Sequence, residues 1–257
     1  MKPTDSPSYL EKKRFFDSLL TIYGRKPVLE ALRDPASQIY RLHLAKSNKP
    51  ATILNEIIDL AQSKGAEIVE HERLALSRIS RNAKQDQGVA ADLVCRGYEH
   101  FSRFLERPLP PKGCLLALDG ITNPANLGMI IRSACAGKID GILLPQTGNA
   151  QIDPLVIKAS AGTLFRAPLL RCERLAEALT RFKDKGARIC ALSSHAEQTL
   201  REFNPEVACV YVLGNETEGV STEVINLCDA RVRIPMNNGV ESLNVAVTAA
   251  LIAFKDS

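Results

Sequence analysis

Short apolar runs alternate with amphipathic stretches along residues 113–257. The apolar runs lack polar alternation and predict buried strands at "CLLALD", "GILLP", "ARICAL", "ACVYVLG" and "RVRIP". Helical spacing of apolar residues follows near 127–137, 154–161, 173–185, 222–228 and 243–255. Strands that are apolar on both faces, each followed by a helix, are typical of a parallel sheet covered on both sides. We therefore predict an α/β domain whose ligands bind in the loops beyond the carboxyl ends of its strands.

A shorter α/β pattern precedes this domain. Strands are predicted at "IYRLHLA", "AEIVE" and "GVAADLVC", and helices at "GRKPVLEALRD", "ATILNEIIDLAQSKG" and "ERLALSRIS". The stretch "FLERPLPPKG", with three prolines, predicts a stiff linker between the two patterns. The predicted division is an N-terminal extension at 1–20, a small α/β domain at 21–98, a linker at 99–112 and the larger domain at 113–257.

Charge is distributed unevenly between these parts. The net charge is +4, but residues 1–112 carry 19 Lys and Arg against 14 Asp and Glu, whereas 113–257 carry 14 against 15. Arg73, Arg78, Arg81 and Lys84 contribute to the excess. A polyanionic partner held by the first part would explain it. On charge alone, an ordinary solvated surface is an equal alternative.

The composition argues against several classes of protein. No run approaches the roughly 18 uncharged apolar residues of a membrane-spanning helix, and the first 20 residues lack the apolar core of an export signal. Seven cysteines occur with no close pair, which disfavours metal sites, redox motifs and a disulfide framework. We expect a cytosolic protein with reduced thiols, no metal and no membrane partner.

The turn after the first strand of the larger domain contains more than packing requires. "GITNPAN" places two asparagines and a proline before an amphipathic helix, and Asn126 is expected to cap that helix. Arg132 lies roughly 130–140° from the centre of the apolar stripe of the helix, at 100° per residue. We therefore expect Arg132 to lie outside the core. Taken alone, both residues also fit purely structural roles.

Two further loops follow strands. "VYVLGNETEGVS" runs from a buried strand into Gly214 and then offers Glu216 among other polar residues. In "RIPMNNGVESLNVAVTAALIAF", Ser242 is expected to cap the last helix, which is apolar almost all round. Burying an amide costs roughly 1–3 kcal/mol unless it is hydrogen-bonded, so Asn244 is expected to have a partner. The apolar helix predicts either a subunit interface or deep burial within one chain.

Together these three loops resemble the three motifs of the SpoU (TrmH-type) branch of the SPOUT RNA methyltransferases. The matching segments are "DGITNPANLGMIIRSA", "VLGNETEGVS" and "IPMNNGVESLNVAV", in the family's order and spacing. The first domain resembles the ribosomal-protein-like RNA-binding domain of the ribosomal RNA ribose methyltransferases, the guanosine-2′-O-methyltransferases in particular. Motif one often reads Asp-Pro in the family, where this chain has Asn123-Pro124, and the third loop is more polar than in many members.

The resemblance implies a fold, a reaction and a site. The larger domain is expected to carry a deep trefoil knot, to form a homodimer, and to bind S-adenosylmethionine through Leu213, Gly214, Ile234, Pro235, Met236 and Leu243. The reaction implied is methyl transfer to a ribose 2′-hydroxyl of RNA, with Arg132, Asn126, Glu216, Ser242 and Asn244 as catalytic residues. A guanidinium is an awkward base because it holds its proton strongly, so Arg132 either acts as the base in a perturbed state or positions the RNA.

The substrate is expected to be structured RNA, read by its shape and backbone, and most of all 23S ribosomal RNA. A transfer RNA 2′-O-methyltransferase, an antibiotic-resistance methyltransferase and a non-catalytic RNA-binding assembly factor with the same fold are the alternatives. A nucleotide-dependent α/β enzyme of another class is disfavoured because no glycine loop that cradles phosphate is present.

Overall fold

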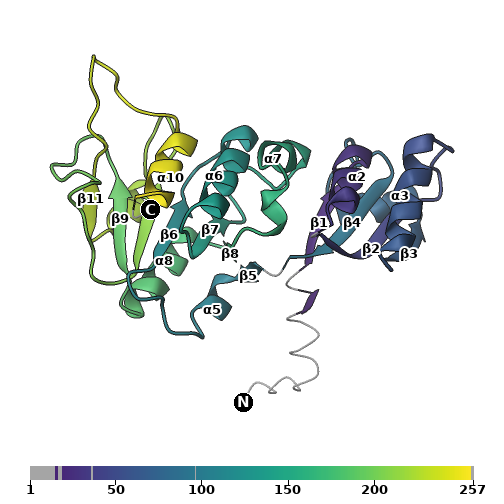
Figure 1. Cartoon of the computed structure of the whole chain (residues 1–257), viewed down its shortest axis with the longest axis horizontal. Helices are drawn as coiled ribbons and strands as arrows, with labels where there is room; N and C mark the ends of the chain where they lie inside the picture. The colour runs from purple at the N-terminus through teal and green to yellow at the C-terminus, as the bar shows by residue number, and fades with distance from the viewer. Residues whose placement is uncertain (1–14, 17–18, 36, 96, 256–257) are drawn as a thin grey trace. The chain divides into compact units, whose positions relative to one another are not determined.

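The computed structural model describes residues 15–255 except 17–18, 36 and 96, and it divides the chain into two compact units (Figure 1). The first comprises Met1–Tyr98 with Ile152–Lys158, and the second comprises Glu99–Gln151 with Ala159–Ser257. Most of the predicted N-terminal extension lies outside the described residues.

The first unit is built on a four-stranded sheet in the order β1-β4-β2-β3. Its strands are β1 (Leu19–Tyr23), β2 (Gln38–Ala45), β3 (Glu67–His71) and β4 (Val89–Val94), and its helices include α2 (Arg25–Arg33), α3 (Thr52–Ser63) and α4 (Arg73–Ser80). Strand β4 runs antiparallel to both β1 and β2, whereas β2 and β3 are parallel. The three predicted strands and three predicted helices are all present. Strand β1 was not predicted.

The second unit contains a seven-stranded sheet in the order β11-β9-β10-β6-β7-β8-β5. Its strands are β5 (Tyr98–His100), β6 (Cys114–Leu118), β7 (Gly141–Pro145), β8 (Leu169–Cys172), β9 (Arg188–Leu192), β10 (Cys209–Leu213) and β11 (Ala230–Val232). The pairs from β11 through β8 are parallel, as the sequence predicts. The trefoil knot implied by the resemblance stays a prediction.

Helices cover both faces of this sheet. They are α5 (Phe101–Phe104), α6 (Pro124–Ala136), α8 (Leu175–Asp184), α9 (Thr222–Ile225) and α10 (Val245–Ala253); α7 (Pro154–Ala159) and the 3-10 turn η1 (Thr163–Phe165) follow β7. The edge strand β5, its neighbour β8 and helix α5 were not predicted. They are short, and apart from Tyr98 the residues of β5 and α5 fall within the predicted linker at 99–112.

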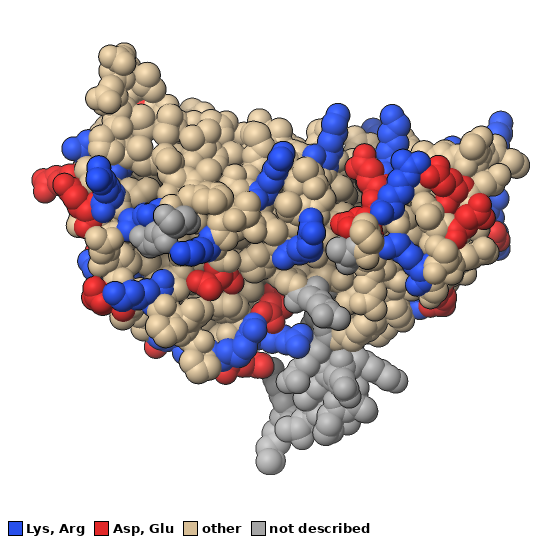
Figure 2. Space-filling model, viewed as in Figure 1, with Lys and Arg blue, Asp and Glu red and all other residues tan. Residues whose placement is uncertain are grey.

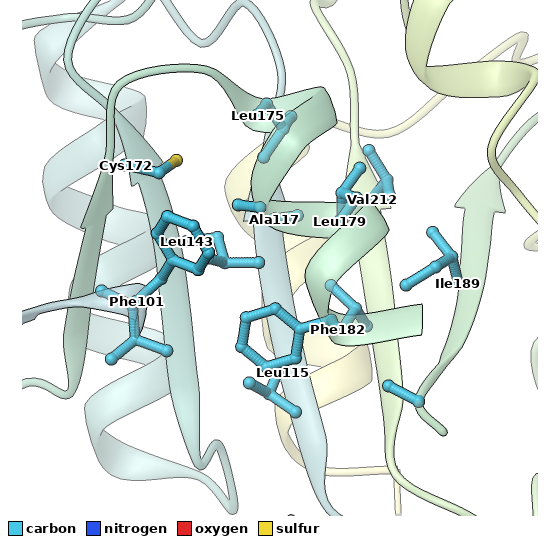
Figure 3. Packing of buried hydrophobic residues seen from close by; sticks show 14 of the residues in the cluster. Phe101, Leu115, Ala117, Leu143, Cys172, Leu175, Leu179, Phe182, Ile189 and Val212 are labelled. Atoms are coloured by element: carbon cyan, nitrogen blue, oxygen red, sulfur yellow. The ribbon is translucent and has the colours of Figure 1, made fainter. Parts of the chain in front are cut away.

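One face of the sheet carries an apolar core beneath α8 (Figure 3). Leu175, Leu179 and Phe182 of the helix meet Leu115 and Val212 of the central strands, and all five are buried. Burying a large apolar side chain is worth roughly 1.5–3 kcal/mol. This core fixes strands β6 and β10 side by side, and therefore fixes the loops that follow them.

Helices α6 and α10 lie against one another beside the sheet (Figure 1). The backbone of Gly137, just after α6, approaches Ala253 so closely that a Cβ at Gly137 would collide with it. Lys138 N donates to Ala253 O over 2.9 Å at the same point. The two helices that carry motifs one and three are therefore held together at their carboxyl ends.

Both helices begin at residues other than the predicted caps. Helix α6 starts at Pro124 and is capped by Asn123, whose side chain accepts from Ala125 N over 2.9 Å. Proline fits the first helical position because no backbone donor is needed there, so the helix begins three residues earlier than expected and Asn126 lies inside it. Helix α10 is capped by Asn244, not Ser242, with Ala246 N donating to Asn244 Oδ1 over 2.8 Å.

Candidate active site

Three loops meet through side chains at the carboxyl ends of β6 and β10. The Asn126 amide nitrogen donates to Glu216 of the second loop, and the Asn126 amide oxygen accepts from Asn244 Nδ2 over 3.0 Å. The sequence predicts these three residues for one site, and the structure brings them together. A single buried carboxamide thus joins all three motifs.

Both ends of the Asn126 side-chain amide are hydrogen-bonded. Its side chain is 7% exposed, and a buried amide without partners would cost roughly 1–3 kcal/mol. Asn244 contributes twice, because its oxygen caps α10 while its nitrogen reaches Asn126. Asn244 itself is exposed, in contrast to the burial on which its expected partner was argued, but the partner is present: it is Asn126, and this bond fixes the start of α10 against α6.

The second loop is a closed turn. Asn215 and Gly219 exchange two backbone hydrogen bonds of 3.0 and 2.9 Å, and Asn215 Oδ1 accepts from Thr217 N over 2.8 Å. Gly214 lies directly under this turn, where any Cβ would collide with the backbone of Gly219 and Val220. Glycine is therefore required at 214 by the loop itself, and the turn presents Glu216 in a fixed position.

The first turn is fixed to the second loop by three bonds. Asp119 N donates to Leu213 O over 2.9 Å, and Asp119 Oδ2 accepts from Ser221 N over 2.7 Å. Asn215 Nδ2 donates to Gly120 O over 2.9 Å. The loops after the adjacent strands β6 and β10 therefore form one structure.

On its other side the first turn is held by the loop after β7. The amide of Asn149 donates to Leu118 O over 3.1 Å and accepts from Ile121 N over 2.6 Å. Ala150 N also donates to Ile121 O over 2.8 Å. The sequence reasoning did not select Asp119, Asn149 or Asn215 as site residues. The signal that could have found Asn149 is an amide shortly after a fully apolar strand, at the edge where ligands bind.

Arg132 lies on α6, two turns beyond Asn126, and is exposed as predicted. Within the described parts of the chain, no hydrogen bond or ion pair engages its guanidinium. Its donors are therefore available to an anion, and Arg is the side chain best suited to bidentate binding of phosphate.

The residues expected to hold the cofactor line the ends of β10 and β11 and the approach to α10. Ile234, Met236 and Leu243 are half-buried, whereas Pro235 and Ser242 are exposed. Leu213 is buried at the end of β10. The expected cofactor residues thus combine backbone at strand ends with apolar side chains that are only partly covered.

The cysteines show no sign of chemistry. No disulfide joins any of the seven, and burial raises the pKa of Cys95 and Cys172 to about 12 and that of Cys228 to about 11. Thiolates are the reactive form, so these thiols stay protonated and unreactive near neutral pH. The described residues contain no group of three or more His, Cys, Asp or Glu side chains arranged for a metal ion. None of the described helices is long and apolar enough to span a membrane.

Comparison with known families accounts for both units. The sequence model of the SpoU rRNA Methylase family matches residues 113–254, and that of the RNA 2′-O ribose methyltransferase substrate binding domain matches residues 21–96. An uncharacterized tRNA/rRNA methyltransferase of Mycobacterium avium is 34% identical over 98% of this chain and 81% of its own length. A similarly named protein of Mycobacterium leprae is 35% identical over 92% of this chain and 76% of its own length.

Solved structures agree with the fold. A putative RNA methyltransferase of the TrmH family from Porphyromonas gingivalis has a TM-score of 0.58 at 26% identity, covering 98% of this chain and 97% of its own. The SpoU methyltransferase AviRb from Streptomyces viridochromogenes, in complex with AdoMet, has a TM-score of 0.63 at 22% identity, covering 95% and 91%. With its three motifs joined in one site and both units matched, this chain belongs to the SpoU rRNA methylase family of S-adenosylmethionine-dependent RNA methyltransferases.

Proposed function

We propose that this chain transfers a methyl group from S-adenosylmethionine to a ribose 2′-hydroxyl in large-subunit ribosomal RNA. The observation that carries the proposal is the chain of hydrogen bonds from Glu216 through Asn126 to Asn244, with the unpaired Arg132 two turns further along α6. Arg132, exposed on the same helix as Asn126, adds a cationic side chain that can bind an RNA phosphate. The family assigned to the first unit, a substrate-binding domain of 2′-O ribose methyltransferases, supports the ribose as target.

The residues expected at the cofactor fit its chemistry. Among the described residues, no backbone hydrogen bond is made by Gly214, Ile234, Met236 or Leu243, so their polar groups are free to bind a ligand. The half-buried side chains at 234, 236 and 243 provide an apolar lining suited to an adenine ring and a methionine chain. Leu213 and Pro235 would complete this lining.

Bound S-adenosylmethionine would supply an electrophilic methyl group on its sulfonium. A 2′-hydroxyl is a poor nucleophile, so it must be aligned with that methyl group and must lose its proton as the bond forms. We assign Arg132 to the phosphate beside the target ribose, where its positive charge also stabilises the oxygen as the proton leaves. Glu216, fixed by Asn126, would accept from a hydroxyl or amino group of the nucleotide, and Ser242 would add a further contact from the third loop.

The first unit would hold the RNA. Its loop between α4 and β4 is organised by Asp86, which is fully buried and accepts from Arg73, from Ser80 Oγ over 2.8 Å and from Gly88 N over 2.9 Å. The exposed Arg81 and Lys84 belong to this loop. Lys and Arg are interspersed with acidic residues on the face of the first unit in Figure 2, so the ordered loop, more than net charge, marks the proposed contact.

The site would form in a homodimer. Val247, Leu251 and Phe254 lie along one side of α10 with 43–48% of their surface exposed, and Met129 of α6 is 40% exposed. Such an apolar stripe is unusual on a monomer surface and suits a self-complementary interface. Within one chain α10 buries Val245, Ala246, Ala249, Ile252 and Ala253, and a partner copy would cover the exposed stripe.

The substrate assignment favours ribosomal over transfer RNA. A separate RNA-binding unit suits a large structured target read through shape and backbone contacts, and the relatives are named for both RNA classes. We place the reaction in the cytosol, in keeping with seven cysteines that form no disulfide.

Ribose-methylation mapping of total RNA from cells with and without this gene tests the proposal. Loss of one 2′-O-methyl group from 23S RNA, restored by the wild-type gene but not by Arg132→Ala, is the expected result. Loss of a transfer RNA mark would redirect the assignment. An unchanged methylation map in a strain that expresses the protein, together with RNA binding by the purified protein, would favour the assembly factor.

A further inference from the structure

The first turn of the site is gripped by a residue that takes no part in the three motifs. Asn149 follows β7, and its amide spans the turn by donating to Leu118 O over 3.1 Å and accepting from Ile121 N over 2.6 Å. Only 9% of the Asn149 surface is exposed. Leu118 is the last residue of β6, and Ile121 lies beyond the strand, in the turn itself.

A second asparagine holds the same turn from the opposite side. Asn215, after β10, donates to Gly120 O over 2.9 Å. Strand β6 lies between β7 and β10 in the sheet, so the turn after β6 is held by amides from the loops after both of its neighbours. Gly120, with a φ of +78°, adopts a left-handed conformation between the two grips.

This turn sets where α6 begins. Ile121 is buried, only three residues separate it from Pro124, and α6 carries both Asn126 and Arg132. A shift of the turn would move the start of the helix, and a misplacement of about 1 Å at a reacting centre can cost roughly 100-fold in rate. The β10 side alone cannot prevent such a shift, because its bonds reach Asp119 and Gly120 but not Ile121.

We propose that Asn149 is a positioning residue for methyl transfer, which sets the first turn and through it the placement of Asn126 and Arg132. This inference rests on the proposed function and concerns the same site. Among the described residues, Asn149 makes its hydrogen bonds to backbone groups and none to the three motif side chains, so it acts through the backbone of the turn. The Asn amide is specifically suited to this role, because the site needs one donor and one acceptor on the same short side chain.

The purified full-length protein provides the test, with Asn149→Ala, Asn149→Asp and the control Leu179→Ala. Leu179 lies on α8 and is buried in the core between that helix and the sheet, so its truncation lowers stability without touching the turn. For Asn149→Ala we expect kcat to fall about 10- to 100-fold, with the Kd of S-adenosylmethionine changed less than threefold. A fall in kcat no larger than that of Leu179→Ala would overturn the proposal.

Asn149→Asp adds a readout that a merely structural role would not move. When the introduced carboxyl group is ionised, it keeps the acceptor for Ile121 N but faces Leu118 O without a proton, whereas the protonated group can donate to that oxygen. Burial favours the neutral form. The ratio of kcat for Asn149→Asp to that of the wild type should therefore rise several-fold as the pH falls from about 8 to 6, while the ratio for Asn149→Ala stays flat. A flat ratio for both variants contradicts the inference.

Hydrogen exchange separates this inference from the proposed function. Asn149→Ala should speed exchange of the amides in Gly120–Asn123 about tenfold or more relative to the wild type, and Leu179→Ala should not. If the wild type transferred no methyl group to any RNA, the proposed function would fail, and the exchange result would still decide whether Asn149 fixes the turn.

Discussion

The carboxamide of Asn126 donates a hydrogen bond to the carboxylate of Glu216, a residue 90 positions further along the chain. The direction of this bond is fixed, because an ionised carboxylate can only accept. The other end of the carboxamide must then accept, and it does so from Asn244. The hydrogen bonds therefore run in one direction through the three motifs, from Asn244 to Asn126 and from Asn126 to Glu216. Substitutions can reverse the direction of the bond between residues 126 and 216.

We expect Asn126→Asp to lower kcat at least tenfold, because it places two carboxylates in contact. Adding Glu216→Gln to that variant should recover much of the loss, since the new amide can donate to the introduced carboxylate, which still accepts from Asn244. The coupling between the two changes should be about 1–3 kcal/mol, the range seen for residues within one network. Steady-state kinetics of the wild type, both single variants and the double variant measure it. Additive losses would mean that the contact has no part in catalysis.

Substitution of Arg132 tests the proposed methyl-transfer reaction directly. Arg132→Ala should abolish methyl transfer, a loss of about 100-fold or more in kcat, while S-adenosylmethionine binds as in the wild type because its loops lie elsewhere. Arg132→Lys keeps the charge but loses the bidentate geometry and should fall between the two. Transfer of a labelled methyl group and calorimetric binding give the two quantities. Full activity of the alanine variant would remove Arg132 from the site.

Most of the second unit was predictable because its strands are apolar on both faces and its helices amphipathic. The pattern could not predict β5 or β8, because strands of three and four residues, each with at most two fully buried apolar positions in a row, do not stand out from their surroundings. Nor could it place the caps. Asn123 and Asn126 are equally good capping residues, and Pro124 decides between them only once its place at the first helical position is considered.

The candidate site was also only partly predictable from the sequence. Asn126, Glu216 and Asn244 were predicted together because they fall in motifs at strand ends, whereas their mutual hydrogen bonds depend on strands β6 and β10 being neighbours. That adjacency is a property of the topology, and nothing local in the sequence encodes it. Asn149 was not predicted for the same reason. Its role depends on the turn after β6, and it lies next to that turn only because β7 is the neighbour of β6 in the sheet.

The loop organised by Asp86 should control RNA binding without affecting the cofactor. Asp86→Ala leaves the buried donors of Ser80 and Gly88 without their acceptor and should cost the first unit about 2–4 kcal/mol. RNA affinity should fall about tenfold or more, with an unchanged Kd for S-adenosylmethionine. Asp86→Asn, which keeps an acceptor of the same shape, should fall less. Filter binding at two salt concentrations measures the affinity and its salt slope, and the slope should fall as phosphate contacts are lost. Calorimetry identifies a variant that has merely unfolded, because its first unit would show no folded transition at the assay temperature.

Acid should weaken the first unit through a histidine pair. His43 Nε2 lies 3.1 Å from Asp92 Oδ2, and His43 Nδ1 lies 2.9 Å from His71 Nε2. Burial, followed by the nearby charges of His43 and Arg41, holds the pKa of His71 below its ordinary value of 6.5. Burial would raise the pKa of Asp92, but hydrogen bonds from His43 and Thr21 outweigh it and the pKa lies below 3.8.

The sign of the pH dependence follows from these two shifts. When the folded pKa of a histidine is depressed, the unfolded chain binds the proton more readily, so stability is lost as the pH falls below about 6.5. Asp92 adds a further loss only below about pH 4. Calorimetric unfolding at about pH 7.5, 6 and 5 should show the Tm of the first unit falling. In His71→Gln, which cannot titrate, that fall should be smaller. An equal fall in both proteins would assign it to other groups.

The apolar stripe on α10 should hold two copies together. Val247 and Val207 are each 47% exposed, but Val247 lies on the stripe, whereas Val207 lies in the loop before β10, outside helices α6 and α10. A buried unpaired charge is costly at an interface, so Val247→Lys should convert the dimer to a monomer, whereas Val207→Lys should leave its mass unchanged. Sedimentation equilibrium at micromolar protein decides between these outcomes. If methyl transfer depends on the dimer, Val247→Lys should also lose activity in proportion to its monomer fraction and regain it at high protein concentration. A fully active monomer would show that one chain holds a complete site.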